Sequence, residues 1–308
     1  MAGLDDSVIQ IEGPWKHRAV SAGGTRFHVA EAGEGPLVLL LHGFPEFWWA
    51  WRHQLVSLSA AGFRAAAVDL RGYGGSDKPP RGYDLVTLAG DAAGLIRALG
   101  EACATVVGHD WGGLLAWTMA VHRPKVVQRL VVASAPHPLR LRQAVRTQPR
   151  RQARAARHSL GFQLPMWPER RLLRDDAALV GRMLHEWSGP GWPDESTERR
   201  IRQAIQIPGV AHSALEYHRW LIRSLPRPDG IRYARSMRTP IQAPTLQIHG
   251  ALDPLTPPSG AQGSGRYVAA PYRWRLIAEA GHFPHEERPE AFDAVLLEWL
   301  KDSGAPGR

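Results

Sequence analysis

Cysteine is nearly missing from this chain, since Cys103 is the only one among 308 residues. A disulfide within the chain is therefore excluded, which suits a reducing compartment. Long apolar runs are missing too, and runs such as Leu37 to Leu41 are far too short to cross a bilayer. The first residues are acidic and lack the apolar core of a signal peptide. We therefore expect no transmembrane segment and a cytoplasmic protein.

Lysine is scarce as well, because only four of the 38 basic residues are Lys. Arginine is concentrated in residues 139–182, where eleven Arg against three Asp or Glu contribute +8 to a net charge of +9 for the chain. The simplest interpretation is a solvent-exposed helical face. No nucleic-acid-binding motif accompanies the charge, so we expect no nucleic-acid partner. A weak contact of this segment with anionic lipid, and a homodimer, are left open.

Strand-like and helical runs alternate along most of the chain, which predicts an α/β fold with a mostly parallel sheet. The alternation stops between about Pro138 and Pro240, in a region rich in Arg, Trp and Pro that is typical of short helices joined by turns. We therefore expect a core made of residues 1–137 and 240–308. Residues 138–239 would form a helical cap over the strand ends, where such sheets bind ligands.

The strands expected from the pattern are Arg26 to Glu31, Leu37 to Leu41, Arg64 to Val68, Thr105 to Gly108, Val126 to Ala133, Thr245 to His249 and Arg273 to Ile277. The expected helices include Trp48 to Ala60, Leu85 to Leu99, Gly113 to His122 and Pro289 to Lys301. These elements place several chemically reactive side chains directly after strands.

One motif carries most of the chemical information, and it reads Gly108-His109-Asp110-Trp111-Gly112-Gly113. It lies between an expected strand and an expected helix, and Gly-x-nucleophile-x-Gly in that context is a nucleophile elbow. Asp110 occupies the nucleophile position, so a serine esterase is not expected. A carboxylate that attacks carbon forms an alkyl ester, which indicates opening of an epoxide or displacement of a halide. Taken alone, the motif would favour Asp110 as the N-cap of the helix.

The chain offers partners for Asp110 in the order acid, then histidine. Asp253 follows the expected strand that ends at His249, and His282 follows the last expected strand. A loop at either place can aim its side chain at the elbow, where Asp253 would fix the tautomer of the imidazole and favour its protonated form. Each residue alone has an ordinary explanation as a turn or loop residue. Three of them in this order, each at a strand end, favour a catalytic triad.

A second turn follows the strand Leu37 to Leu41, in the sequence His42-Gly43-Phe44-Pro45. It can point the backbone N–H of Phe44 at the site, and the N–H of Trp111 is the second donor of the predicted oxyanion hole. We expect Pro45 and the Trp111 side chain beside the substrate. His42 and His109 are interpreted as structural residues.

Four motifs together resemble the epoxide hydrolases of the α/β-hydrolase superfamily, over about residues 24–136 and 240–300: His42 to Glu46, Asp69 to Asp77, Gly108 to Gly113 and Gly281 to Phe283. The resemblance implies that Asp110 is the nucleophile, His282 the base and Asp253 its carboxylate partner. The product would be a vicinal diol, formed through a hydroxyalkyl ester on Asp110 from a small, lipophilic epoxide. The sequence shows no metal-ligand spacing and no phosphate-binding glycine motif in the right context, so we expect no metal and no cofactor.

The cap departs from this family at two positions. Typical members carry two cap tyrosines that bind and protonate the epoxide oxygen. One is the middle residue of Tyr-Tyr-Arg or Trp-Tyr-Arg, and the triplet Tyr217-His218-Arg219 puts His218 there. The other precedes Phe-Gln-x-Pro by four residues, and Phe162 to Pro165 point to His158. Because an imidazolium is a competent acid, we expect His218, with His158 or Tyr217, to donate the proton. The alternative is that these histidines are cap surface residues.

Two other functions are compatible with the sequence. A haloalkane or haloacid dehalogenase would use the same triad, but it needs two donors for the departing halide. The indole of Trp111 can provide one, whereas Phe44 has no side-chain donor for the second. A ligand-binding protein without catalysis is the other alternative, because a fold does not by itself establish an activity.

Overall fold

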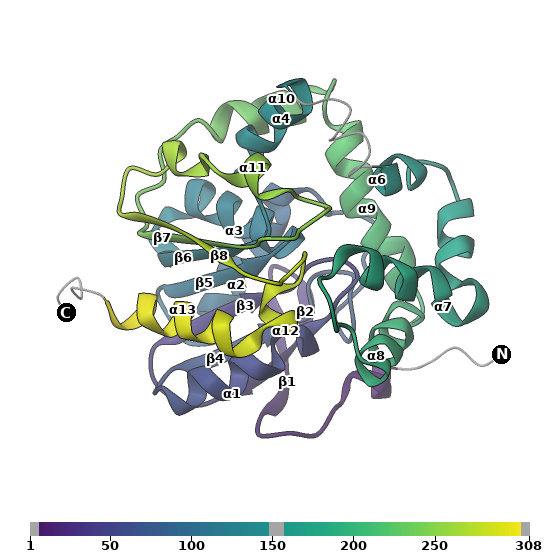
Figure 1. Cartoon of the computed structure of the whole chain (residues 1–308), viewed down its shortest axis with the longest axis horizontal. Coiled ribbons are helices and arrows are strands. Elements are labelled where there is room, and N and C mark those ends of the chain that lie inside the picture. The colour runs from purple at the N-terminus through teal and green to yellow at the C-terminus, as the bar shows by residue number, and fades with distance from the viewer. Residues whose placement is uncertain (1–5, 148–156, 303–308) are drawn as a thin grey trace.

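The computed structural model describes residues 6–147 and 157–302. Within these residues one eight-stranded sheet forms the centre, in the strand order β1-β2-β4-β3-β5-β6-β7-β8 (Figure 1). β2 is antiparallel to both of its neighbours, and the other pairs are parallel. The expected α/β fold with a mostly parallel sheet is confirmed. The strands are β1 (Lys16–Ala22), β2 (Thr25–Ala32), β3 (Leu37–Leu41), β4 (Arg64–Val68), β5 (Ala104–His109), β6 (Val127–Ala133), β7 (Thr245–Gly250) and β8 (Tyr272–Ile277).

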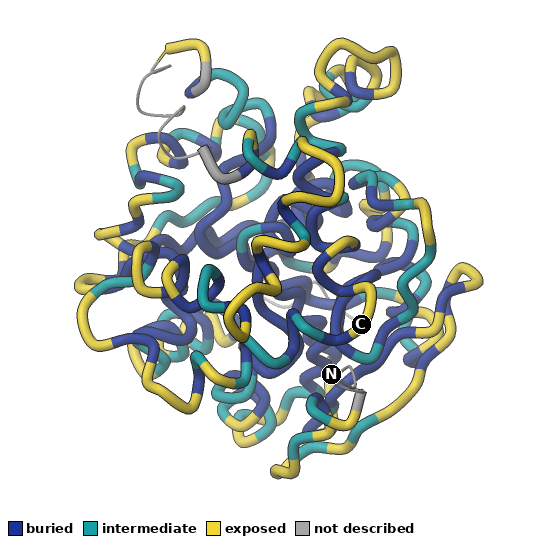
Figure 2. Tube along the Cα trace, turned by 90° about the vertical axis from the view of Figure 1, so that its right-hand side faces the viewer, coloured by how far each residue is buried: buried dark blue, intermediate teal, exposed yellow. Residues whose placement is uncertain are grey.

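Helices cover both faces of this sheet. α1 (Arg52–Ala60) and α13 (Pro289–Lys301) contact each other on one face, and α2 (Leu85–Ala98) and α3 (Trp111–His122) on the other (Figure 1). Every residue of β3 and β5 is buried, as is typical of strands that are covered on both faces. Figure 2 shows the resulting buried interior and the exposed loops around it. The short helices α11 (Pro258–Ala261) and α12 (Pro284–Glu287) follow β7 and β8.

The expected strands agree closely with the observed bounds, but two elements differ. The sequence does not predict β1, because most side chains of this edge strand are exposed and the apolar alternation is weak. The expected helix from Trp48 begins instead as a short 3-10 helix, Trp48–Trp51, and continues as α1. The three tryptophans of this segment are buried, so packing overrides their modest helix propensity.

Between β6 and β7 the chain forms a group of helices that lies beyond one end of the sheet (Figure 1). They are α4 (Pro138–Thr147), α6 (Arg157–Gly161), α7 (Trp167–Trp187), α8 (Glu195–Ile205), α9 (Val210–Arg223) and α10 (Pro228–Ser236). We call these helices the cap. No helix in the described part of the chain is long and apolar enough to cross a membrane.

Two glycines allow the sharp turn between β5 and α3. A Cβ atom at Gly108 would lie 2.1 Å from the backbone oxygen of Gly112, and one at Gly112 would lie 2.1 Å from the backbone oxygen of Leu41. Backbone atoms at these distances cannot move aside without shifting a central strand. Asp110, between the two glycines, has a positive φ of 48°, so its side chain is held at the tip of a strained turn.

Gly112→Ala is therefore expected to lower the free energy of unfolding by about 3 kcal/mol, at the upper end of the cost of overpacking. The matched control is Gly161→Ala, because a Cβ atom there meets nothing within 4 Å; we expect it to change stability by less than about 0.5 kcal/mol. Urea unfolding followed by tryptophan fluorescence measures both variants. Equal unfolding midpoints for the two variants would contradict the close approach at Gly112.

Candidate active site

The parallel strands end at one edge of the sheet, and their last turns carry the chemically reactive residues. Phe44 follows β3, Asp110 follows β5, Asp253 follows β7 and His282 follows β8. Because these strands are neighbours or near neighbours in the sheet, side chains that are far apart in the sequence meet under the cap. The structure therefore brings together the three residues of the expected triad.

Asp110 is held as an anion by donors on two sides. Its Oδ2 accepts a hydrogen bond from the Phe44 N–H at 3.0 Å, and its Oδ1 lies 3.7 Å from His282 Nε2. Burial raises the pKa of this carboxyl, but the neighbouring His282 and His109 and the Phe44 N–H lower it further, so the pKa falls below its usual value. The side chain makes no capping hydrogen bond to α3. It remains 19% exposed, so a ligand can reach it.

His282 is fixed on its far side by Asp253. Its Nδ1–H donates to Asp253 Oδ2 at 2.9 Å, and Asp253 Oδ1 accepts the backbone N–H groups of Leu255 and Thr256 at 2.9 and 2.8 Å. Burial lowers the pKa of His282, but the two carboxylates Asp253 and Asp110 outweigh it and raise the pKa to about 10. The resting site therefore holds an imidazolium between two carboxylates.

The two backbone amides expected to form the oxyanion hole belong to Phe44 and Trp111. The Phe44 N–H already points at the Asp110 carboxylate. Trp111 begins α3, and the first N–H groups of a helix have no partner within it. Pro45, which follows Phe44, is buried in the same turn. The oxyanion hole formed by these two donors stays a prediction.

The helix α9 places His218 over this site. Its Nδ1–H donates to the Ala214 backbone oxygen at 3.2 Å, and its Nε2 accepts the indole N–H of Trp111 at 3.2 Å. Burial lowers the pKa of His218 to about 4, although Asp110 raises it in part. The neutral ring therefore directs a lone pair, and not a proton, toward Trp111. The sequence does not show the burial of this ring, and the expected role of His218 as the acid during ester formation stays a prediction.

Tyr217 and His158 complete the expected cap residues. The hydroxyl of Tyr217 donates to the Arg71 backbone oxygen at 2.7 Å, and burial raises its pKa well above 10. In this structure the Tyr217 hydroxyl therefore donates away from Asp110, and its role as a proton donor stays a prediction; its ring packs 5.6 Å from that of Trp111. His158 falls in α6, but its side chain lies outside the described residues.

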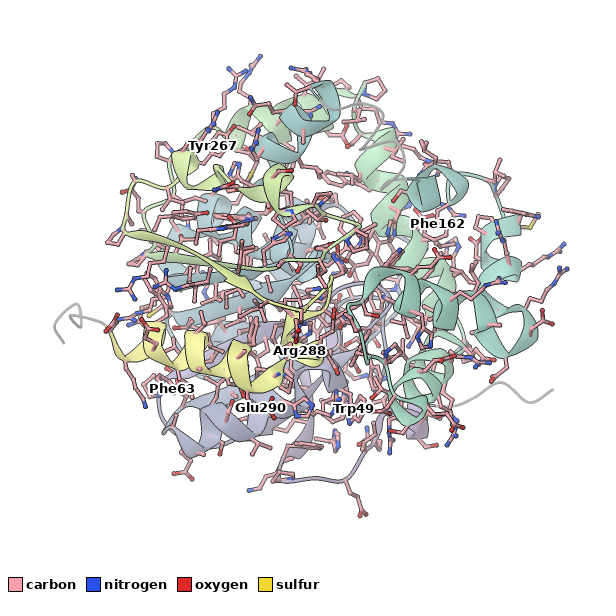
Figure 3. The ribbon with its side chains drawn as sticks, in the orientation of Figure 1. Trp49, Phe63, Phe162, Tyr267, Arg288 and Glu290 are labelled. Carbon is pink, nitrogen blue, oxygen red and sulfur yellow. The ribbon has the colours of Figure 1, made fainter. Side chains whose placement is uncertain are left out.

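Aromatic rings close the space between the cap and the core. The ring of Phe162 in the cap (Figure 3) lies 5.8 Å from that of Phe44 and 5.1 Å from that of His218. Trp187, at the end of α7, lies 6.2 Å from Phe44 and 6.1 Å from His282. An apolar enclosure of this kind excludes water and strengthens the charges inside it.

One carboxylate ties the cap to the loop that carries His282. Glu287 accepts the backbone N–H groups of Gly281 at 2.7 Å and Phe283 at 2.8 Å, and that of Gly189 in the cap at 2.6 Å. The backbone N–H of His282 itself donates to the Trp187 oxygen at 2.8 Å. The end of α7 and the catalytic loop are therefore one hydrogen-bonded unit.

Sequence reasoning missed a buried network beneath the nucleophile. Glu46 Oε2 accepts from His109 Nδ1 at 2.7 Å and from the Gly43 N–H at 3.1 Å, and its Oε1 lies 3.4 Å from His285 Nε2. The sequence contained one signal of this network, Glu46 itself, because a carboxylate buried among Phe and Trp residues needs a hydrogen-bond partner. In the described part of the chain, Glu46, His109 and His285 also bring three ligand-type atoms within 4.8 Å. Glu46 Oε2 is already hydrogen-bonded to His109 and Gly43, and we assign no metal there.

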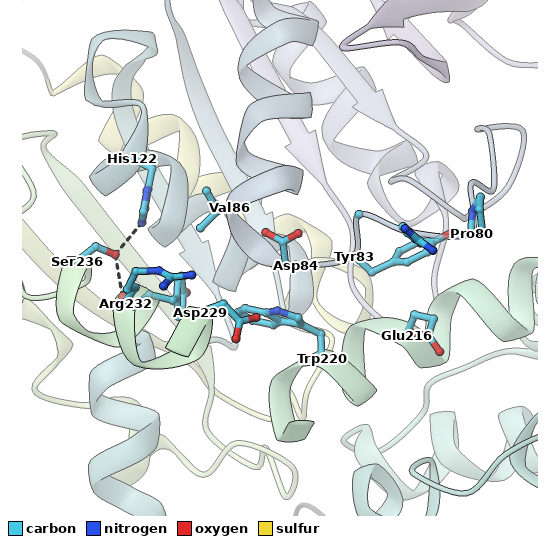
Figure 4. Close-up of a pocket in the computed structure, with 13 residues that line it drawn as sticks. Pro80, Tyr83, Asp84, Val86, His122, Glu216, Trp220, Asp229, Arg232 and Ser236 are labelled. Atoms are coloured by element: carbon cyan, nitrogen blue, oxygen red, sulfur yellow. Dashed lines mark hydrogen bonds between the residues drawn. The ribbon is translucent and has the colours of Figure 1, made fainter. Parts of the chain in front are cut away.

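A cavity of about 600 Å³ lies between α2 and α3 of the core and α9 and α10 of the cap (Figure 4). It is lined by charged and aromatic side chains such as Asp84, Trp220 and Tyr233, and by none of the triad residues. Tyr83 also lines it, and the ring of Tyr83 lies 5.6 Å from that of Tyr217. Because Tyr217 in turn contacts Trp111, aromatic rings separate this cavity from the site.

The α/β hydrolase fold family model matches residues 36–289, which include the whole parallel part of the sheet and the cap. This chain belongs to that family. Within it, the chain is a hydrolase that falls among the epoxide hydrolases. It is 35% identical to epoxide hydrolase 3 of Xenopus tropicalis over 91% of this chain and 76% of that protein.

Other epoxide hydrolases resemble this α/β hydrolase along nearly the full length of both chains. Epoxide hydrolase A of Mycobacterium tuberculosis is 31% identical over 92% of this chain and 96% of its own. The crystal structure of epoxide hydrolase A from Mycobacterium thermoresistibile superposes with a TM-score of 0.78 at 29% identity, covering 94% of this chain and 98% of that one.

Proposed function

We propose that this hydrolase converts an epoxide to a vicinal diol through a covalent ester on Asp110. One observation carries the proposal: an ionised carboxylate at the tip of the elbow lies between the Phe44 N–H and the His282–Asp253 pair. The named activity of the relatives agrees with it. A carboxylate nucleophile forms an alkyl ester with a ring carbon, which hydroxyl nucleophiles of esterases do not.

In the first step, an oxygen of Asp110 attacks one ring carbon from behind. The new carbon–oxygen bond forms as the ring carbon–oxygen bond breaks, and the released oxygen takes up a proton to become a hydroxyl. Asp110 is suited to this step because its pKa is held low, so it is a carboxylate throughout the neutral range.

In the second step, His282 becomes a base because the first step removes a charge beside it. Asp110 is neutral once it is an ester, so one of the two carboxylates that raise the pKa of His282 disappears. His282 then releases its proton and takes one from a water molecule. The hydroxide attacks the ester carbonyl, the N–H groups of Phe44 and Trp111 stabilise the oxyanion, and the diol leaves with Asp110 restored as a carboxylate.

The proton for the released oxygen has a source in the Trp111–His218 pair. The two nitrogens are 3.2 Å apart, so an oxygen that enters between them replaces their mutual hydrogen bond. The indole of Trp111 then donates to that oxygen. His218 takes a second proton at Nε2 from solvent, in the small fraction that its pKa of about 4 allows at neutral pH, and it transfers this proton to the released oxygen as the ring opens.

This role predicts a steep pH dependence of the first step. The pKa of His218 is lowered to about 4, so the doubly protonated ring is scarce at neutral pH and grows as the pH falls. In the His282→Gln background, we expect the rate of ester formation to rise about tenfold per unit from about pH 8 to about pH 5. His218→Tyr should remove this dependence, because a tyrosine keeps its proton up to about pH 10.

Stopped-flow tryptophan fluorescence measures the rate of ester formation across this range. His212→Tyr is the matched control, since His212 lies on the same helix with an exposed side chain, and it should keep the steep dependence. A rate that is flat with His218 present would show that another group donates the proton.

The same pair of donors also favours a second candidate, the displacement of a halide. The indole of Trp111 and a protonated His218 can both bind a departing chloride or bromide. His218 thus supplies the second donor, which the side chain of Phe44 cannot provide. A panel of epoxides and haloalkanes, assayed for diol and for halide ion, separates the two activities. Diol formation without halide release supports the epoxide hydrolase, and halide release alone supports the alternative. Tight binding of panel members without any product would favour a non-catalytic receptor.

A further inference from the structure

The end of α6, the beginning of α7 and the turn between them expose large apolar side chains to solvent. Leu160, Leu164, Met166 and Trp167 are each at least half exposed. Exposed apolar side chains are ordinary when they are scattered, but a group of them within eight residues indicates a contact with another molecule. Figure 1 shows α6 and the start of α7 at the outer edge of the cap, away from the sheet. A second molecule can therefore reach this group without entering the active site.

Arginine side chains continue the same surface. Residues three and four positions apart lie on one face of a helix, so Arg170, Arg171 and Arg174 follow the face that begins with Trp167, and all three are exposed. The guanidinium of Arg171 lies 5.1 Å from the centre of the Trp167 ring. Leu172, on the opposite face, is fully buried. The exposed face therefore combines apolar groups with positive charge.

The acidic groups nearby leave most of this charge in place. Glu169 turns inward and pairs with Arg219 of α9 at 2.8 Å. Asp176, beyond the arginines, pairs with Arg202 of α8 at 2.9 Å. Asp175 adds one further exposed carboxylate next to the last arginine. Three outward arginines against one aspartate give this surface a net positive charge.

Two arginines of α9 hold the turn in one conformation. Arg219 donates to the backbone oxygens of Phe162 at 3.0 Å and Leu164 at 2.9 Å. Arg223 donates to the backbone oxygen of Gln163 at 2.9 Å. The Phe162 side chain is buried and anchors the turn from below. Because the turn is ordered before any contact, binding through it requires little additional ordering of the chain.

We propose that this surface binds the cap to an anionic membrane, and we call it the docking face: Leu160, Leu164, Met166, Trp167, Arg170, Arg171 and Arg174. Tryptophan is favoured at the level of lipid headgroups, where its ring is partly in apolar and partly in polar surroundings. Guanidinium groups bind phosphate oxygens through paired hydrogen bonds. Apolar groups that enter the headgroup boundary beside arginines on anionic lipid are the composition of an interfacial contact.

The charge distinguishes this occupant from a second copy of the chain. In a two-fold contact each docking face would lie against its own copy, so the arginines of both chains would be brought together and repel each other. An anionic lipid surface instead supplies the opposite charge and an apolar layer at the same place.

Co-sedimentation with lipid vesicles tests the charge of the docking face and needs no epoxide. We expect the protein to bind vesicles of equal parts phosphatidylcholine and phosphatidylglycerol at least about tenfold more tightly than vesicles of phosphatidylcholine alone, and to be released as the salt concentration rises. Replacing Arg170, Arg171 and Arg174 together by Gln should weaken binding to the mixed vesicles at least about tenfold.

The matched control removes the same charge from the core. Arg97, Arg123 and Arg275 are exposed arginines on other elements, and their joint replacement by Gln should change binding by less than about twofold. An equal loss in both triple variants would assign the binding to the overall charge of the protein and overturn the docking face. Failure of the unmodified protein to bind the mixed vesicles would overturn it as well.

Contact of Trp167 with the lipid is tested separately. Brominated phosphatidylcholine quenches tryptophans that reach the acyl chains, and Trp167→Phe should remove this quenching while binding changes less than about threefold, because the apolar bulk stays. Trp15→Phe, which alters a half-buried tryptophan before β1, should keep the quenching. Quenching that persists without Trp167 would place another surface against the membrane and refute the proposal.

The rival occupant is tested by sedimentation velocity. We expect the protein and its Leu164→Ser, Met166→Ser double variant to show the same oligomeric state, and the double variant to lose at least about tenfold in vesicle binding. Both side chains are exposed, so the unfolding midpoint should not change. A dimer that this double variant dissociates would assign the surface to a second copy of the chain and overturn the membrane contact.

Discussion

Asp110→Ala is expected to lower kcat for epoxide hydrolysis by about 10⁴-fold or more, because the variant has no group that can form the ester. The alanine removes a partly exposed side chain from the strained turn, so the unfolding midpoint should hardly fall. Asp302→Ala is the matched control, since that aspartate lies at the exposed end of α13 with a surface partner, and its activity should stay within about twofold of the parent protein.

The path of the water oxygen tests the same claim without any substitution. In a single turnover in oxygen-18 water, the label enters the Asp110 carboxylate, because water attacks the ester carbonyl and not a ring carbon of the epoxide. Mass spectrometry of the peptide that contains Asp110 measures it. Label in the diol alone, with an unlabelled Asp110 peptide, would indicate direct attack of water on the epoxide and refute the ester.

His282→Gln is expected to separate the two steps. The ester should still form, because Asp110 needs no base, and then persist, because nothing activates water; kcat should fall by about 10³-fold. The intact mass should rise by the mass of one substrate molecule. His122→Gln, which alters a half-buried histidine bonded to Ser236, should neither accumulate the adduct nor lose activity. A His282→Gln protein that turns over normally would remove His282 from the mechanism.

The pH dependence of the second step has the opposite sign to that of the first. His282 has a pKa of about 10 while Asp110 is charged, and the pKa falls once the ester has formed. Hydrolysis of the ester should therefore speed up as the pH rises through this lowered value, whereas ester formation slows as His218 loses its second proton. A bell-shaped profile of kcat follows if the two steps have similar rates.

The sequence could predict which residues lie close together in the site, because each of them follows a strand of the same sheet. Asp110, Asp253 and His282 each follow a strand of one parallel sheet, and the carboxyl ends of such strands meet at one edge. The glycines around Asp110 predicted a sharp turn that the backbone contacts of Gly112 now explain. These features depend on the local pattern and on topology, which the sequence expresses directly.

Protonation states could not be foreseen, because they depend on partners from distant elements. The hydrogen bonds of His218 with Ala214 and Trp111 place its proton on Nδ1, and burial under the cap lowers its pKa. The hydrogen-bond partners of His109 likewise come from distant turns, those after β3 and β8. A motif names the residue type at a position but does not say which of its atoms holds a hydrogen.

The hydrogen bonds from Glu287 and from the His282 backbone restrict how the enclosure can open. If the end of α7 swung outward like a lid, it would pull the base away from Asp110 with it. A motion that opens the enclosure and preserves the triad must therefore leave this end of α7 in place. The end of α7 is thus a fixed support for the base and not a moving lid.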